Sequence, residues 1–120
     1  MQSIVNEMLE SIPNCIAVRV AEIDSGMALA SGSKDSRIEP ELAAAYNAEV
    51  VKQKLKAKRA LGLENQNIED ILITLTEQYH VLAVVPNNVY FVYVATTKES
   101  NLAIIRNTIR KYMDKIGKQV

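Results

Sequence analysis

The chain has 120 residues, which suits one domain, and 48% of them are apolar against 23% charged, the balance of a globular core with a solvated surface. Lysine and arginine number 14, as do aspartate and glutamate, so the formal net charge is zero and composition argues against nucleic-acid binding. One cysteine excludes an internal disulfide, and one histidine argues against a metal site or catalytic triad. No apolar run approaches the ~20 residues that span a bilayer, and the N-terminus lacks the basic region of a secretory signal. We therefore expect a cytoplasmic, non-enzymatic single domain over residues 1–120, without cofactor or metal.

Apolar periodicity and turn residues divide the chain into eight elements. In chain order, they are a helix at 3–12, strands at 15–23 and 27–30, a helix at 39–61, strands at 71–76, 79–85 and 89–96, and a helix at 100–116, with a loop expected at 31–36. Ser3 suits the cap of the first helix, and Pro13 ends it. Asp24-Ser25-Gly26 is a turn signal for the first hairpin, because Asp bonds nearby backbone and Gly accepts positive φ.

The strand at 15–23 is apolar on both sides. Simple alternation places Ile16, Val18 and Val20 on one face and the small residues Cys15 and Ala17, with Arg19 and Ala21, on the other. Short connections make the last three strands an antiparallel meander. The sequence therefore predicts the α+β class, a single-domain α/β/α sandwich with a five-stranded antiparallel sheet and the order α-β-β-α-β-β-β-α.

The long helix at 39–61 carries two apolar stripes, since residues advance by about 100° around a helix. The first stripe comprises Ala44, Ala48, Val51 and Leu55, and the second comprises Ala43, Tyr46, Val50 and Ala57, with Lys54 projecting beside it. One stripe can cover the sheet. The other either packs deeply within the same chain or forms a protein–protein interface, most simply in a symmetric homodimer.

The order of elements, the Glu22-Ile23-Asp24-Ser25-Gly26 hairpin and the segment Ser100-Asn101-Leu102-Ala103-Ile104-Ile105-Arg106 together resemble the roadblock/dynein light chain family. The resemblance covers about residues 3–116 and depends on the order and spacing of all parts. It departs from the family at two turns, Glu77-Gln78 and Asn87-Asn88, where relatives often have glycine; Asn tolerates positive φ, so the second hairpin can persist.

The resemblance implies that the long helix lies on one face of the sheet and the terminal helices on the other. It also implies that two copies pair through the long helix and the edge strand after it, which adds Ile71, Ile73 and Leu75 to the interface. Family members bind or regulate small Ras-like GTPases or act as scaffold subunits of motor and membrane-associated complexes. Bacterial relatives often accompany a GTPase of the polarity type, and some stimulate its hydrolysis.

Few residues offer chemistry of their own. His80 lies in register with apolar strand residues and lacks a nearby acidic or metal-ligating cluster, so a structural role is favoured. Cys15 is interpreted as a small buried hydrophobe. No phosphate-binding glycine loop is present, which argues against the chain being the GTPase itself. The basic run 52–59 is interpreted as a solvated helix end, and Arg106 and Arg110 as an exposed face of the last helix.

Three functions remain open. The first is a homodimeric, noncatalytic regulator or adaptor that binds a small Ras-like GTPase and shifts its switch region by differential binding; if it accelerates hydrolysis, it does so by positioning the GTPase's own residues. The second is a scaffold subunit indifferent to nucleotide. The third is a small-molecule sensor, against which the strands offer few convergent polar groups and 5% aromatic residues.

Overall fold

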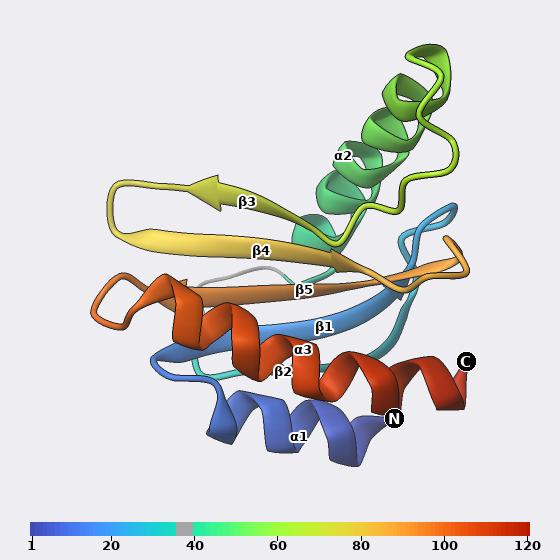
Figure 1. Ribbon diagram of the computed structural model, residues 1–120. Helices are drawn as coiled ribbons and strands as arrows, with labels where there is room; N and C mark the ends of the chain where they lie inside the picture. Colours follow the sequence, from blue (N-terminus) through green and yellow to red (C-terminus); the bar gives the residue numbers. More distant parts are fainter. Residues whose placement is uncertain (36–39) are drawn as a thin grey trace.

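The computed structural model describes residues 1–35 and 40–120. Its elements, in chain order, are α1 (Gln2–Ser11), β1 (Cys15–Glu22), β2 (Ala28–Ser33), α2 (Pro40–Ala60), β3 (Asp70–Thr74), β4 (Gln78–Val84), β5 (Tyr90–Thr97) and α3 (Leu102–Gln119) (Figure 1). The predicted order and fold class are confirmed. The predicted start of the long helix at Glu39 lies outside the described residues.

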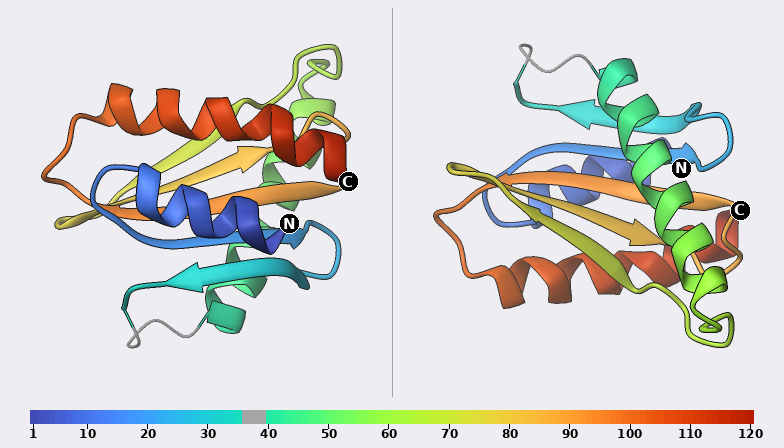
Figure 2. Two further views of the ribbon diagram at one scale, coloured as in Figure 1. Left: turned by 90° about the horizontal axis from the view of Figure 1, so that it is seen from below. Right: turned by 90° about the horizontal axis from the view of Figure 1, so that it is seen from above.

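The five strands form one antiparallel sheet with the spatial order β2-β1-β5-β4-β3. The two hairpins therefore meet where β1 pairs with β5, and β2 and β3 are the two edges. Figure 2 shows α1 and α3 side by side on one face and α2 alone across the other. This arrangement is the predicted three-layer sandwich.

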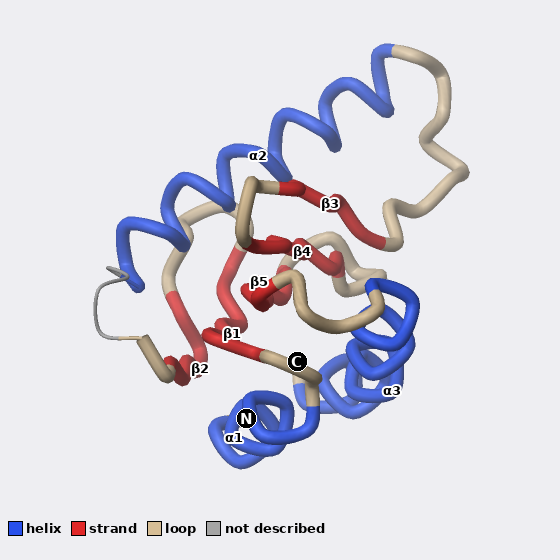
Figure 3. Tube along the Cα trace, turned by 90° about the vertical axis from the view of Figure 1, so that its left-hand side faces the viewer, coloured by secondary structure: helices blue, strands red, loops and turns tan. Residues whose placement is uncertain are grey.

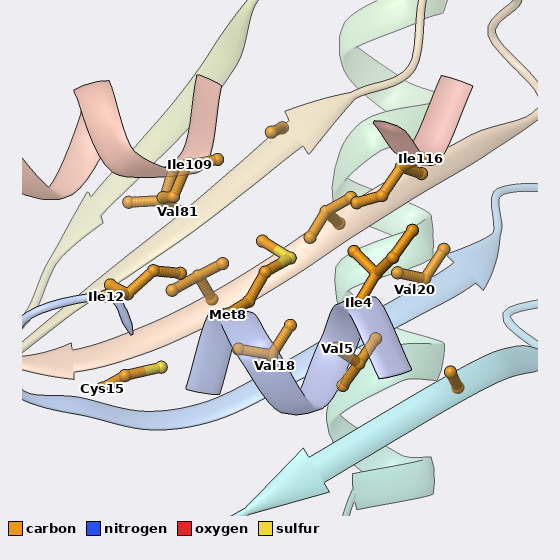
Figure 4. Packing of buried hydrophobic residues seen from close by; sticks show 14 of the residues in the cluster. Ile4, Val5, Met8, Ile12, Cys15, Val18, Val20, Val81, Ile109 and Ile116 are labelled. Atoms are coloured by element: carbon orange, nitrogen blue, oxygen red, sulfur yellow. The ribbon is translucent and has the colours of Figure 1, made fainter. Parts of the chain in front are cut away.

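The larger core lies between the sheet and the pair α1 and α3. Met8 is fully buried at its centre, with Ile4 of the same helix and Val18 of β1 around it, and Ile109 and Ile116 close it from α3 (Figure 4). These side chains follow the helical spacing of α1 and α3, so local periodicity accounts for this layer.

The second core lies between the sheet and α2. Phe91 and Leu82 contribute large, fully buried side chains from β5 and β4, while Ala48 and Val51 approach from α2. Alanine at the contact lets the helix lie close to the sheet. Because α2 alone covers this face, only one stripe of the helix is used.

A bulge in β1 corrects the predicted faces of its first two residues. The pairing with β5 shifts between Cys15 and Ala17, so one extra residue enters β1. Cys15 therefore packs with the α1/α3 core and half-buried Ile16 with the α2 core, the reverse of simple alternation. Val18 and Val20 keep their predicted face.

The strand β2 is longer than predicted, because residues 31–33 were expected in a loop and instead pair with β1 as far as Ala17–Ser33. Small polar residues give no strand pattern, but the pairing satisfies their backbone. On the outer edge, the Gln2 side-chain amide donates to the Ser31 carbonyl at 2.9 Å and accepts from its N–H at 3.4 Å. Gln2 thus occupies this edge position as a neighbouring peptide group would.

Three local predictions concern caps and turns. Ser3 does not cap α1, because the helix begins one residue earlier, after Met1. Gly26 adopts φ 73° and its N–H donates to the carbonyl of Glu22 at 2.8 Å, as the turn signal predicted. Asn88 adopts φ 59°, which confirms that asparagine replaces glycine in the second hairpin.

Candidate functional site

The inner stripe of α2 is fixed on the sheet. Ala44, Ala48 and Val51 are buried, and Leu55 is half-buried against the same core. The stripe predicted to cover the sheet is therefore the one that does so. It sets the rotation of the helix, and with it the direction in which every other side chain of α2 points.

The second stripe of α2 faces outward. The Tyr46 side chain is 68% exposed, Lys54 and Ala57 are exposed, and Ala43 and Val50 are half-buried at the edge of the α2 core. The alternative in which this stripe packs deeply within the same chain is wrong for Tyr46 and Ala57. The chain therefore presents an aromatic ring with small and aliphatic neighbours, an amphipathic surface of the kind that proteins use for contact.

Two exposed leucines extend this surface and were not predicted. Leu61 is 72% exposed directly after the helix, and Leu42 is 55% exposed in its first turn. Leu61 follows Ala43 by 18 residues, which is about five helical turns at 3.6 residues per turn, so it continues the line of the second stripe. That spacing was the available signal. The helix end that carries Leu61 extends past the sheet (Figure 1).

The strand β3 borders this surface as an edge strand. Ile71 and Ile73 are half-buried and pack against the α2 core, as expected. Leu75 lies beyond the end of β3 and is 43% exposed, because the hairpin already closes with its N–H donating to the Gln78 carbonyl at 2.9 Å. By the alternation of an antiparallel ladder, Leu72 and Thr74 then direct their N–H and C=O groups away from β4. The strand therefore offers a free backbone edge beside an apolar face.

Part of the sheet beside α2 is left without a helix above it, toward the β3–β4 hairpin (Figure 2). His80 lies there, half-buried, with Nε2 2.8 Å from Gln78 Oε1 and its ring 5.3 Å from that of Tyr93 in an edge-to-face arrangement at 88°. Burial lowers the pKa of His80 below 6.5, which favours the neutral ring at neutral pH. His80 is thus an aromatic side chain on the part of the sheet that no helix covers, in agreement with the structural role indicated by its register with apolar residues.

The charged side chains of α2 contact near neighbours or solvent. The Lys52 ammonium donates to the Asp24 carbonyl at 3.0 Å and lies 2.7 Å from the Glu49 carboxylate. The hydrogen bond from Lys52 lowers the pKa of Glu49. Lys56 and Arg59 are exposed. The basic run is therefore spread around the solvated end of the helix, as interpreted from the sequence.

The arginines of α3 correct one prediction. Arg106 is not simply exposed: its Nε and Nη2 donate to Asp70 Oδ2 and Oδ1 at 3.1 and 3.0 Å, which ties α3 to the first residue of β3. Arg110, one turn later, lies 4.0 Å from Glu69 with both side chains exposed. Only the second pair fits the predicted solvated face.

Cys15 and His80, the two side chains considered above for chemistry, lie apart from any cluster of reactive groups among the described residues. Burial raises the pKa of the Cys15 thiol to about 12, and its Sγ lies 3.6 Å from the Ala17 carbonyl, so it is no nucleophile at neutral pH. Within residues 1–35 and 40–120, no group of three or more His, Cys, Asp or Glu side chains could hold a metal ion. Across that same range, neither the length nor the apolarity of any helix suffices to cross a bilayer. The features of interest are therefore surfaces.

Comparison with known proteins finds likeness in structure alone. No protein-family model matches the chain, and no curated protein matches it in sequence. Myxococcus xanthus MglB is similar with a TM-score of 0.88 and 14% identity, over 98% of this chain and 92% of that chain. A Roadblock/LC7 domain from Streptomyces avermitilis has a TM-score of 0.85 and 9% identity, over 99% and 96% of the two chains.

The likeness extends to a protein of another kind. Profilin II of Acanthamoeba castellanii has a TM-score of 0.67 and 13% identity, over 98% of this chain and 97% of that chain. The agreement with MglB and the Roadblock/LC7 domain is closer and also spans nearly the whole chain. At these identities the likeness establishes fold and not function. The chain thus has the fold of Roadblock/LC7 domains and MglB, as the sequence resemblance implied.

Proposed function

We propose that this protein is a homodimeric, noncatalytic regulator that binds a small Ras-like GTPase. The observation that carries the proposal is the open face formed by the second stripe of α2 and the free edge of β3, on a fold shared with MglB. The sequence resemblance supplies the GTPase as partner. A surface rather than a reactive group is the feature that such a role requires.

In the proposed dimer, the α2–β3 face of one copy meets the same face of a second copy. The interface comprises Ala43, Tyr46, Val50, Lys54, Ala57, Ile71, Ile73 and Leu75. Tyr46 is its anchor, because its 68% exposed side chain has the most apolar area to bury. A tyrosine buries roughly 150–250 Å² when fully covered, so at about 25 cal/mol per Å² the exposed part contributes roughly 3 kcal/mol per copy.

The β3 edges complete the contact. Leu72 and Thr74 direct backbone groups outward, and pairing them across a two-fold axis satisfies these groups and removes the edge as an aggregation site. Ile71 and Ile73, half-buried in one copy, then become fully covered by the neighbouring α2. A continuous sheet across two copies places both α2 helices on the same side.

The regulatory step is differential binding. A dimer surface that prefers one nucleotide state of the GTPase shifts the population of its switch region toward that state. Acceleration of hydrolysis, where it occurs, comes from positioning the residues of the GTPase that orient the attacking water. The scaffold alternative uses the same face but binds its partner equally in both nucleotide states.

The dimer is tested by placing a charge on the open face. Tyr46→Glu forces an unpaired carboxylate into the interface, and Val50→Glu replaces an apolar side chain there by a charged one, so sedimentation should show a shift from dimer to monomer at low concentration. Lys56→Glu is the matched control, because it adds a carboxylate to an exposed position of α2 outside the second stripe. Dimers that persist in both face variants would refute this interface.

The partner is tested by capture from the source lysate with GDP or a nonhydrolysable GTP analogue, followed by binding to the purified GTPase. Enrichment of a small GTPase in one nucleotide state supports the regulator. Equal affinity for both states refutes it, and a partner other than a GTPase retained in both conditions favours the scaffold. Tyr46→Glu as bait shows whether the partner requires the dimer.

A further inference from the structure

A buried arginine without a partner lies beneath the first half of α2. Arg19 is in the middle of β1, in register with Ser31 of β2 and Tyr93 of β5, and its side chain is 7% exposed. Its neighbours along the strand, Ala17 and Ala21, belong to the α2 core, so the arginine projects into the same layer. A charge at this position is unusual, since buried charges in proteins are nearly always paired.

One nitrogen of the guanidinium is left unsatisfied. Its Nε is buried without a hydrogen-bond partner, and nowhere in the described chain does an acidic side chain form an ion pair with Arg19. Burial lowers the pKa of Arg19, and the exposed carboxylate of Glu41 on α2 partly offsets this by acting at a distance. The side chain remains charged at neutral pH, as arginines do. It is therefore a buried cation that lacks an anion.

Two cavities border Arg19, and they differ in the charged side chains that line them. The larger, about 480 Å³, has the Glu41 carboxyl in its wall together with Met27. The smaller, about 250 Å³, is lined by Arg19, by the small or apolar residues Ala17 and Ala43, by Tyr93, and by the hydroxyl side chains of β2. Among the described residues that line the smaller cavity none is acidic, so we assign the anion to this cavity rather than to the one beside Glu41.

We propose that this smaller cavity binds a small monocarboxylate, with the carboxylate on the Arg19 guanidinium and a short apolar body against Ala17, Ala43 and Tyr93. The planar fork of a guanidinium matches a carboxylate in a bidentate arrangement. Ser31 supplies a further hydroxyl donor, whereas the Ser33 hydroxyl already donates to the Asp35 carbonyl at 2.8 Å. A phosphate carries more charge and more acceptor atoms than one guanidinium and the Ser31 hydroxyl can satisfy beside alanines and a tyrosine ring. The proposal does not depend on the proposed function.

The first test is a titration with butyrate, followed by NMR at the backbone amides of Ala43, Tyr93 and Ser31. Butyrate should give saturable shifts at these amides. Butyramide, which has the same shape without the charge, should bind roughly tenfold more weakly, because charge-assisted hydrogen bonds are the stronger kind. Inorganic phosphate should give no saturable shift. Equal binding of butyrate and butyramide, or tighter binding of phosphate, would overturn the assignment.

Substitutions at Arg19 separate binding from folding. Arg19→Met keeps the length and apolar stem of the side chain and should abolish butyrate binding, while thermal unfolding occurs at the same temperature or higher, because an uncompensated buried charge is gone. Arg19→Lys keeps the charge without the fork and should bind more weakly than the wild type. A marked loss of thermal stability in Arg19→Met would show that Arg19 serves the fold and would overturn the proposal.

Two further variants keep Arg19 in place. Ala43→Leu fills the cavity from α2 and should also abolish butyrate binding. Glu41→Gln removes the nearby carboxylate that competes for the guanidinium, so butyrate should bind more tightly. Weaker binding in Glu41→Gln, or unchanged binding in Ala43→Leu, would show that the carboxylate lies elsewhere.

Because Ala43 also belongs to the proposed interface, the titration is repeated on Tyr46→Glu. Unchanged butyrate affinity in this variant shows that one copy completes the cavity, whatever the state of the dimer. Loss of binding would show that a second copy is needed and would overturn the cavity as assigned. The cavity and the dimer can therefore fail separately.

Discussion

The ion pair between Arg106 and Asp70 should stabilise the fold measurably, because it ties α3 to the edge strand β3. Two charge-assisted hydrogen bonds of 3.1 and 3.0 Å join the side chains, which are 32% and 17% exposed. Exposed pairs contribute at most about 1 kcal/mol, and hydrogen bonds to charged groups about 1.5–3 kcal/mol. With Arg106 about one-third exposed, we expect a coupling energy of about 1–2 kcal/mol.

Removal of one partner should cost more than the coupling itself. Arg106→Met leaves the mostly buried Asp70 carboxylate without its cation, so the free energy of unfolding should fall by about 2 kcal/mol. For a domain of this size, that corresponds to a decrease of roughly 8 °C in the unfolding temperature. Hydrogen exchange at Ile73, whose N–H faces β4, should also accelerate, because β3 pairs with β4 on one side only.

The assay is a double-mutant cycle of Arg106→Met, Asp70→Asn and the double variant, measured by urea unfolding. The matched control is the cycle of Arg110→Met and Glu69→Gln, one turn away, where the charged atoms are 4.0 Å apart and both side chains exposed. The control coupling should be close to zero. A coupling below about 0.3 kcal/mol for Arg106 and Asp70, or equal values in both cycles, would refute the assigned role.

Three further changes test other parts of the fold. Gly26→Ala and Gly62→Ala both alter a residue at φ 73°, but a Cβ at Gly26 also meets the α2 backbone at 3.3 Å, whereas a Cβ at Gly62 meets nothing within 4 Å. Gly26→Ala should therefore lower the free energy of unfolding by about 1 kcal/mol more than Gly62→Ala does. Equal losses in urea unfolding would contradict this contact. Asn101→Ala removes the side-chain acceptor at the start of α3 and should cost about 1 kcal/mol by the same assay, whereas Asn101→Asp keeps the cap and should cost little. Burial lowers the pKa of His80 below 6.5, so the unfolded chain takes up the proton first as the pH falls. The stability of the wild type relative to His80→Gln should therefore decrease between about pH 7.5 and about pH 5.5. A constant difference in unfolding free energy would show that the ring is not held neutral.

Periodicity predicted the candidate face but not all of its members. The two stripes of α2 follow from residue spacing alone, and burial of Ala48 with exposure of Tyr46 agrees with that division. Leu75 was wrongly placed in β3, because a strand end depends on where its hairpin closes. His80 joins the face only because α2 leaves its end of the sheet open, and helix placement over a sheet is a tertiary property.

The β2 edge of the sheet also could not be predicted from local sequence. Nothing in residues 31–33 signals a strand, and β2 extends over them because β1 lies alongside. In the end-on view of Figure 3, α2 lies on one side of the strands and the terminal helices on the other. The layer order itself was implied by the resemblance and by the number of apolar stripes on each helix. Neither of these implied the exact registers of the strands.

The sequence by itself determined the order of elements, the sandwich class and the inner and outer sides of α2, because each depends on residues within a few turns or one hairpin. The tertiary structure alone decided the β1 bulge, the pairing of Arg106 with Asp70 across 36 residues, and the cavity at Arg19. These features arise where segments distant in the chain meet. The spacing of residues along the chain does not predict such long-range contacts, because the free energy of each contact depends on which distant residue the fold places beside it.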